Sequence, residues 1–558
     1  MKTRPESLRA IAGESFDVCV IGGGATGAGC ALDSQLRGLK TVLLEAGDFG
    51  GATSSASTKI VHGGVRYLEQ AVKDLDAKQY HVVRCALHER ISMLRNAPYL
   101  AGRMEFLVPC FCWLDAAYFD AGLKMYDWIA GRARLSPSRF LSREETLRRI
   151  PALKPDGLVG AVAYADGQFN DSRYNIALVE TFTGAGGETL NYARVIAFEK
   201  SSAGKLAACE AEDRFTRSTF QIRARAFVNA TGPYADTLRQ LAAPGAAPRM
   251  RLSKGSHILL PLEVMPGADA VLIPRTEDGR VLFAVPWMGR LLVGTTEQEV
   301  SVHDELHLTK DEVEYLLCHL NRYLVNPVTP NQIVSGFAGA RPLVSAGDSC
   351  GTQKLARDHE VEIDSQSGLV SIMGGKWTTY RAMAEDTVDA VQKYLGVQPT
   401  ASPTRNRPLA GSEGFAPGYS QHLAGEFGIA DAVARHLAER FGTAAPRVLE
   451  LAAENAELAK PVISGFPALG AEVAYAARTE MAVTIEDVLF RRLGIQLYSW
   501  RLAIHAAPVV AAILAREFSW PADRTRAAVQ EYVARINRLL ALAGLEPEPD
   551  SDAGGSIQ

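Results

Sequence analysis

The chain has 558 residues, of which 47% are hydrophobic and 22% are charged. This composition is typical of a folded globular protein with several domains and excludes a disordered or fibrous chain. Its 59 basic and 63 acidic side chains leave a formal net charge of −4. Such a chain lacks the global positive field that bulk nucleic-acid binding requires, so we expect no nucleic-acid partner.

The eight cysteines are scattered in mostly apolar surroundings, which favours buried thiols over disulfides. Cys110 and Cys112 form C-x-C without a second pair or a histidine cluster at zinc spacing, so we predict no metal site. Residues 1–15 lack the apolar segment of a signal peptide, and the apolar stretch 503–515 is too short to span a bilayer. We therefore expect a protein of a reducing compartment with, at most, peripheral membrane contact.

The first strong pattern is an apolar strand over residues 16–21, followed by the glycine-rich segment 22–27 and a helix over 28–37. A second strand over 41–44 ends in Glu45. This order predicts a βαβ unit that binds a dinucleotide. Gly22 permits the tight turn, Gly24 leaves room for a pyrophosphate, and Gly27 allows close helix packing. Glu45, 23 residues after Gly22, can accept hydrogen bonds from a ribose.

Three features favour FAD over NAD as the dinucleotide. The sequence contains no second G-x-G-x-x-G after a strand, so a nicotinamide domain is absent. Residues 52–59 are rich in small hydroxyl side chains, which suits a loop beside a second nucleotide half. A third feature is the tight turn at Ala230, Thr231 and Gly232, which resembles the turn that closes over the adenine side in FAD proteins. The second and third features rest on resemblance to FAD proteins.

The rest of the chain divides by pattern. Strand-like alternation over 256–260, 281–285 and 291–293 indicates an inserted, more antiparallel region. A strand and turn over 368–375 precede a helix from 378 to about 394, and helical spacing continues to about 544. We predict an oxidoreductase domain over 14–395, with an FAD-binding part of about 14–90, 155–235 and 335–395. The substrate part is about 91–154 and 236–334, followed by a linker (396–411), a helical domain (412–544) and a disordered tail (545–558).

Several motifs resemble those of FAD-dependent sn-glycerol-3-phosphate dehydrogenases. The most specific are H-G-G-V-R-Y-L at residues 62–68 and G-G-K-W-T-T-Y-R at residues 374–381. Further matches run in order from about residue 16 to 386, and a weaker one lies at 484–489. The resemblance implies an α/β glutathione-reductase-like FAD-binding fold of the amino-acid-oxidase type, with an inserted antiparallel substrate-binding sheet and a C-terminal all-helical domain.

The resemblance also implies a function. The expected reaction is oxidation of glycerol 3-phosphate to dihydroxyacetone phosphate, with hydride transfer to FAD and electrons passed to a membrane quinone. The expected protein is cytoplasmic, peripheral on the cytoplasmic face of a bacterial inner membrane, and a homo-oligomer, with a dimer expected. Residues 490–493 offer apolar and basic side chains for membrane contact, although an internal helix explains them as well.

Oxidation of a phosphorylated alcohol needs cations for the phosphate and a base for the hydroxyl proton. Arg66, Arg341 and Arg357 lie in or near matched motifs, and the guanidinium fork suits phosphate oxygens. Lys376 can face the flavin or the substrate, and His257 can accept the proton. We therefore predict His257, Arg341 and Lys376 as catalytic residues. The predicted substrate-binding residues are Arg66, Tyr67, His257, Arg341, Arg357 and Lys376.

Simpler explanations exist for each of these side chains, since surface arginines are usually solvated, Tyr67 suits core packing, and His257 suits a structural role in a strand. The hydroxyl residues also suit plain turns.

The predicted cofactor-binding residues are Gly22, Gly24, Ala25, Thr26, Gly27, Glu45, Thr53, Ser55, Ser57, Lys59, His62, Gly63, Gly64, Val195, Ala230, Thr231, Gly232, Gly375, Lys376, Trp377 and Thr378.

Two alternatives to a quinone-linked dehydrogenase stay open at this point. One is an oxidase of the same fold that passes electrons to oxygen and acts on glycerol 3-phosphate or on an amine or amino acid. The other is a non-enzymatic flavoprotein.

Overall fold

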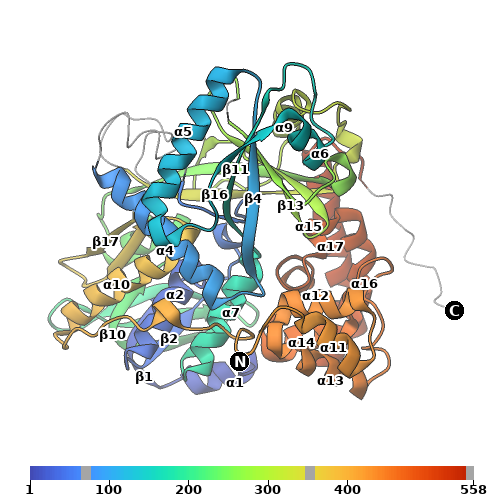
Figure 1. The fold of residues 1–558 in the computed structure, drawn as a ribbon. Helices are drawn as coiled ribbons and strands as arrows, with labels where there is room; N and C mark the ends of the chain where they lie inside the picture. The colour runs from blue at the N-terminus through green and yellow to red at the C-terminus, as the bar shows by residue number, and fades with distance from the viewer. Residues whose placement is uncertain (65–76, 275, 346–358, 548–558) are drawn as a thin grey trace.

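The computed structural model describes residues 1–64, 77–274, 276–345 and 359–547. Two β-sheets lie side by side, and a helical domain packs beside them (Figure 1). The predicted FAD-binding α/β fold with a second, mainly antiparallel sheet and a helical C-terminal domain is confirmed.

The first sheet, called here the nucleotide-binding sheet, is built on parallel strands. Its strands run in the order β17 (His359–Ile363), β18 (Val370–Gly374), β10 (Thr219–Asn229), β1 (Ser15–Ile21), β2 (Thr41–Leu44) and β7 (Glu188–Leu190). β1 pairs in parallel with both β2 and β10, as expected for strands linked by crossover helices. An antiparallel extension is formed by β8 (Ala193–Lys200) and β9 (Leu206–Asp213), which pairs with β10.

Helices cover this sheet because its strands are apolar on both faces. α2 (Ala25–Leu36) packs against α10 (Tyr380–Leu395) and α7 (Asp171–Gly184), and these helices share one core with β1 and β2. α8 (Ala235–Ala242) packs against the opposite core, and α1 (Arg4–Ile11) lies near β7. α2 begins three residues earlier than predicted, because the Ser54 hydroxyl accepts a hydrogen bond from the Ala25 amide at 2.9 Å.

The second sheet, called here the substrate sheet, is almost entirely antiparallel. Its order is β15 (Gln298–Val300), β11 (Met250–Pro261), β14 (Arg290–Gly294), β13 (Leu282–Trp287), β12 (Ala270–Ile273), β4 (Ala101–Cys110), β6 (Gly160–Phe169) and β3 (Ile60–Val61). In addition, β16 (Ser335–Val344) pairs with β11, and β5 (Arg139–Ser142) pairs with β6. β3, β6 and β16, which the sequence placed in the FAD-binding part, thus lie in the substrate sheet.

Helices α4 (Ala77–Asn96), α5 (Trp113–Ala130), α6 (Arg143–Arg149) and α9 (Lys310–Asn321) surround the substrate sheet. α5 forms an outer edge of the molecule (Figure 1). Short 3₁₀ helices occur at Thr53–Ser55, Gly131–Ala133, Gly232–Tyr234, Leu262–Val264, Pro330–Gln332, Trp377–Thr379, Thr404–Asn406 and Gly442–Ala444.

The C-terminal domain contains α11 (Tyr419–Phe427), α12 (Asp431–Phe441), α13 (Ala445–Glu454), α14 (Gly470–Thr479), α15 (Ile495–Tyr498), α16 (Trp500–Phe518) and α17 (Ala522–Leu542), with a π-helix at Asp487–Arg492. One continuous apolar core joins these helices to the substrate sheet. The preceding segment 396–411 lies along the FAD-binding part, where the Arg37 guanidinium group donates to the Thr400 carbonyl at 2.8 Å. The helical domain is therefore integrated with the rest of the fold.

Candidate active site

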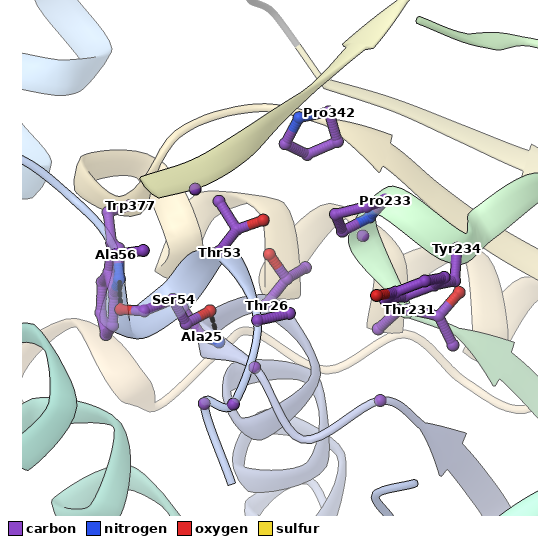
Figure 2. A pocket seen from close by; sticks show the side chains of 18 of the residues that line it. Ala25, Thr26, Thr53, Ser54, Ala56, Thr231, Pro233, Tyr234, Pro342 and Trp377 are labelled. Atoms are coloured by element: carbon purple, nitrogen blue, oxygen red, sulfur yellow. Dashed lines mark hydrogen bonds between the residues drawn. The ribbon is translucent and has the colours of Figure 1, made fainter. Parts of the chain in front are cut away.

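A cavity of about 820 Å³ lies where the two sheets meet. Its walls come from the glycine loop after β1, residues 45–58, the turn after β10, strands β11 and β16, and the turn after β18. In Figure 2, Thr231 and Tyr234 lie on one side of Thr26, and Ala56 and Trp377 lie on the other. The size suits a ligand larger than a simple metabolite.

The glycine loop keeps its backbone close to neighbouring segments. A Cβ atom at Gly22 would lie 2.5 Å from the Ala230 carbonyl oxygen, and one at Gly27 would lie 1.7 Å from the Gly22 carbonyl oxygen. Gly22 also has a φ of 110°, which favours glycine. Together these glycines allow the turn at the N-terminus of α2, where backbone N–H groups can receive an anion.

Glu45 orders this loop through its carboxylate. Its two oxygens accept hydrogen bonds from the Gly23 amide at 2.6 Å and the Gly47 amide at 2.7 Å. Burial raises the pKa of the Glu45 carboxyl, while these backbone donors act in the opposite direction. The side chain lines the cavity, so it lies where the sequence pattern requires a ribose acceptor.

The hydroxyl-rich loop 53–59 is held from several sides. The Trp377 indole donates to the Ser54 carbonyl at 2.8 Å, as drawn in Figure 2, and the Thr53 hydroxyl donates to the Ala340 carbonyl at 2.6 Å. Asp171, the first residue of α7, accepts from the Ser57 hydroxyl at 2.7 Å and from the Lys59 ammonium at 2.7 Å. This buried ion pair fixes the loop against α7.

Lys59 was predicted to bind the cofactor, but its ammonium group is buried on Asp171 and is not part of the cavity wall. Gly27, Ser55, Gly63 and Gly64 likewise lie outside the wall. Gly27 instead permits helix packing.

The other predicted positions that the structure describes line the cavity, and their individual roles stay predictions. They are Gly22, Gly24, Ala25, Thr26, Glu45, Thr53, Ser57, His62, Val195, Ala230, Thr231, Gly232, His257, Arg341, Gly375, Lys376, Trp377 and Thr378. Arg66, Tyr67 and Arg357 lie outside the described residues.

The pairing of β11 with β16 brings His257 and Arg341 to one face. In this antiparallel register His257 lies opposite Phe337, Gly255 opposite Gly339, and Ser253 opposite Arg341. Residues at alternate positions of paired strands share a face. The missing side chain of Gly255 leaves room for the Arg341 guanidinium group, and that of Gly339 leaves room for Ala56. A Cβ at Gly255 would lie 2.5 Å from Arg341 Nη2.

His257 is only 2% exposed, and its ring stacks on Phe337 with centroids 4.7 Å apart. Burial, followed by the nearby charges of Arg341 and Lys59, holds the pKa of His257 well below its usual value. The imidazole is consequently neutral at pH 7. Its Nε2 lies 3.0 Å from the Thr58 hydroxyl, and the buried Nδ1 has no hydrogen-bond partner in the described part of the chain.

Several side chains at this site were not predicted from the sequence patterns. Asn175 donates to the Gly23 carbonyl at 2.9 Å, one turn after Asp171 on α7. Asp171 and Asn175 lie four positions apart and so share one face of α7, which was the available signal. Glu486, Arg491 and Arg535 of the C-terminal domain also line the cavity, without any local pattern that indicates it.

Comparisons with known proteins agree with this geometry. Residues 17–381 match the FAD dependent oxidoreductase family, and residues 402–525 match the C-terminal domain of alpha-glycerophosphate oxidase. The mitochondrial glycerol-3-phosphate dehydrogenase of Mus musculus is 38% identical over 90% of this chain and 71% of its own length. The corresponding Arabidopsis thaliana protein is 39% identical over 94% and 86%.

A solved structure matches over nearly the whole fold. The glycerol-3-phosphate dehydrogenase of Bacillus halodurans, complexed with FAD, superposes with a TM-score of 0.78 and 30% identity, over 96% of this chain and 97% of that chain. This chain belongs to the FAD-dependent glycerol-3-phosphate dehydrogenase family.

FAD is the cofactor of this family member, and the residues of the cavity fit it. The glycine loop and the N-terminus of α2 offer backbone N–H groups to a pyrophosphate, and Glu45 offers a carboxylate to a ribose. In FAD-dependent dehydrogenases of this kind, the bound flavin supplies the hydride acceptor. The predicted family, enzyme class and cofactor are therefore confirmed.

Proposed function

We propose that the chain oxidises sn-glycerol 3-phosphate to dihydroxyacetone phosphate and passes the electrons to a membrane quinone. The observation that carries this proposal is the shared face of β11 and β16, where a buried neutral imidazole and a guanidinium group border one cavity. The curated relatives named above are dehydrogenases of this substrate, which supports the same reaction.

Arg341 is suited to hold the substrate phosphate. Its guanidinium is half-buried, and its Nη2 donates to the Thr295 hydroxyl at 2.9 Å, which restrains the side chain toward Gly255. A planar guanidinium matches two phosphate oxygens at once, so it orients as well as attracts the substrate. The phosphate is remote from the reacting carbon, and holding it brings that carbon into line for hydride transfer.

His257 is suited to accept the hydroxyl proton. In the tautomer whose Nε2–H donates to the Thr58 hydroxyl, Nδ1 is the ring nitrogen that can accept a proton. The neutral state that burial and the neighbouring cations impose is the state that a base requires. Lys376, which also lines the cavity, adds positive charge for the reduced flavin or the substrate oxygens.

The decisive experiment mixes the FAD-loaded enzyme with glycerol 3-phosphate without oxygen and records the flavin spectrum. We expect loss of the oxidised flavin absorption. Arg341→Ala should lower kcat/KM by about 100-fold or more, since it removes charge-assisted hydrogen bonds. Arg251→Ala is the matched control, because Arg251 lies on β11, the strand that pairs with β16, but binds Glu299 away from the cavity. Unchanged absorption in the wild type would refute the proposed substrate.

Reaction in air separates the dehydrogenase from an oxidase of the same fold. Glycine oxidase from Geobacillus kaustophilus shares the fold at 19% identity and a TM-score of 0.51. We expect little peroxide with glycerol 3-phosphate and fast turnover with a soluble quinone. Peroxide formed in equal amount to product would favour the oxidase, and an Arg341→Ala variant with normal turnover of an amine would favour an amine substrate.

We place the membrane contact on α5. Its exposed apolar side chains include Leu114, 84% exposed, Trp128, 74% exposed, and Trp113, 67% exposed. Trp113 also contacts Phe140 with ring centroids 5.6 Å apart, and the exposed Arg132 follows the helix. Tryptophan side chains beside basic residues suit the interface of an anionic bilayer. No described helix is both long enough and apolar enough to cross a bilayer.

The segment 490–493 is a poor membrane contact, contrary to one of the two sequence-based explanations. Arg491 and Arg492 are buried, and both bind the carboxylate of Asp48. The explanation as an internal helix applies, because this segment ends a π-helix inside the C-terminal domain.

Sedimentation with vesicles of phosphatidylglycerol tests the α5 contact. The double variant Trp113→Ser/Trp128→Ser should lose at least half of the bound fraction, whereas Val509→Ser, at an exposed apolar residue of α16, should bind as the wild type does. Equal binding of all three proteins would contradict the assignment. A salt wash of fractionated cells tests peripheral association with a bacterial inner membrane, and light scattering tests the proposed dimer.

A further inference from the structure

Three side chains of the C-terminal domain form part of the cavity wall. Glu486 and Arg535 make an ion pair with each other, and Arg491 binds Asp48, which lies three residues after Glu45. These side chains therefore border the cavity at its Glu45 end, far along the chain from the glycine loop. A domain that served only to bury apolar surface would have no need of charged groups at this position.

Asp48 links this domain to the FAD-binding part through two buried guanidinium groups. Its buried carboxylate accepts hydrogen bonds from Arg492 Nη1 at 2.7 Å and Nη2 at 2.9 Å, and it also accepts one from Arg491. Burial alone would raise the pKa of Asp48, but the two guanidinium groups lower it to about 2. The carboxylate is therefore charged at pH 7 and held by two cations from another domain.

The loop that carries Asp48 also holds the glycine loop. The Gly51 amide donates to the Asp48 carbonyl at 2.9 Å, and the Gly50 amide donates to the Gly23 carbonyl at 3.0 Å. Glu45, at the start of the same loop, accepts from the Gly23 amide at 2.6 Å. Glu45 and Gly50, which both bond Gly23, lie on the same short loop as Asp48. We therefore expect the position of Gly23 to depend on where Asp48 is held.

A second set of hydrogen bonds also joins the FAD-binding part to the C-terminal domain. The Tyr192 hydroxyl donates to Asp487 at 2.7 Å, and the Asn191 amide group donates to the Met481 carbonyl at 2.8 Å. Tyr192 lines the cavity beside Glu45 and precedes β8. Two segments of the FAD-binding part are therefore joined to the π-helix region.

We infer that the C-terminal domain is a component of the FAD site, with Asp48, Arg491 and Arg492 as positioning residues for the adenosine half. Docking of the π-helix segment and binding of FAD stabilise each other, because a ligand that prefers the docked arrangement must shift the equilibrium toward it. The inference depends on FAD as cofactor and is independent of the proposed substrate and electron acceptor.

Hydrogen exchange of the wild-type chain, with and without FAD, tests this coupling without any substitution. We expect FAD to slow amide exchange over residues 487–492 by at least tenfold. Residues 445–454 of α13, which lie in the same domain but line no part of the cavity, are the internal control and should exchange at one rate in both samples. Equal exchange at 487–492 with and without FAD would overturn the inference.

Variants test whether the contacts of the C-terminal domain strengthen FAD binding, with FAD affinity measured by flavin fluorescence. Asp48→Asn should raise the dissociation constant of FAD at least tenfold. If that variant does not fold, Arg535→Ala carries the test, because Arg535 is exposed at the rim; its expected increase is at least threefold. Arg538→Ala is the matched control on α17, since Arg538 pairs with Glu305 outside the cavity. Unchanged affinity in Arg535→Ala and Asp48→Asn would overturn the inference.

Discussion

At His257, three influences on one side chain act in the same direction. Burial, the charge of Arg341 and the charge of Lys59 all favour the neutral imidazole. Asp171 neutralises much of the Lys59 charge, because its carboxylate lies 2.7 Å from the ammonium. The ionisation of the proposed base is therefore decided by side chains that come from three separate segments.

This ionisation predicts a pH dependence of stability. As the pH falls below about 6.5, the unfolded chain protonates His257 while the lowered pKa keeps the folded chain neutral there, so the folded state loses stability. His257→Gln should reduce the slope of the unfolding free energy against pH by up to about 1.4 kcal/mol per pH unit. Urea unfolding at several pH values measures it. His303→Gln, at an exposed histidine, is the control, and equal slopes for His257→Gln and the wild type would contradict the prediction.

At the scale of elements, α5 has two distinct faces. Its outer face carries the exposed Trp113, Leu114 and Trp128, and its inner face carries Tyr126. The Tyr126 hydroxyl accepts a hydrogen bond from the Gly63 amide at 2.7 Å and donates to the buried Asp166. Gly63 follows His62, which lines the cavity. The proposed membrane helix is thus bonded directly to the loop beside the flavin site.

Tyr126→Phe should destabilise the protein by about 1–3 kcal/mol, because it leaves a buried amide and a buried carboxylate short of a partner. Tyr118→Phe, on the partly exposed side of the same helix, should change stability by less than about 0.5 kcal/mol. Urea unfolding of both FAD-loaded variants measures the difference. Equal stabilities would show that the Tyr126 hydroxyl does not hold the loop.

At the scale of the whole molecule, α7 connects the FAD-binding part with the C-terminal domain. Arg173 donates to both oxygens of Glu480 at 2.8 and 2.9 Å, and both residues are buried. Arg492 lies 3.2 Å from the same carboxylate. A buried group of this kind specifies how two parts dock, since any other arrangement leaves charges without partners.

Glu480→Ala should therefore cost about 3–5 kcal/mol of unfolding free energy, because it leaves buried guanidinium groups uncompensated. Glu517→Ala, which removes a more exposed ion pair with Arg478, should cost less than about 1 kcal/mol. Guanidinium unfolding of the holoenzyme measures both. If the two variants prove equally stable, the buried pair does not contribute to docking.

Local patterns were sufficient for the first half of the cofactor site. An apolar strand, a glycine loop and an acidic residue after the next strand lie within residues 16–45, so they appear as spacing in the sequence. The motifs at 62–68 and 374–381 indicated the family. The strand alternation that predicted an inserted sheet was also local, although the assignment of β3, β6 and β16 to the substrate sheet was not predicted.

The sequence by itself thus determined the dinucleotide loop, the kind of cofactor and the family, because each depends on residues that are close in the chain or fall into family motifs. Only the tertiary structure decided that Lys59 binds Asp171 instead of lining the cavity, that Gly255 makes room for the Arg341 guanidinium group, and that Asp48 is held by the C-terminal domain. These contacts join residues up to 444 positions apart. A buried charge selects its partner by distance in space, and that selection leaves no periodic trace in the sequence.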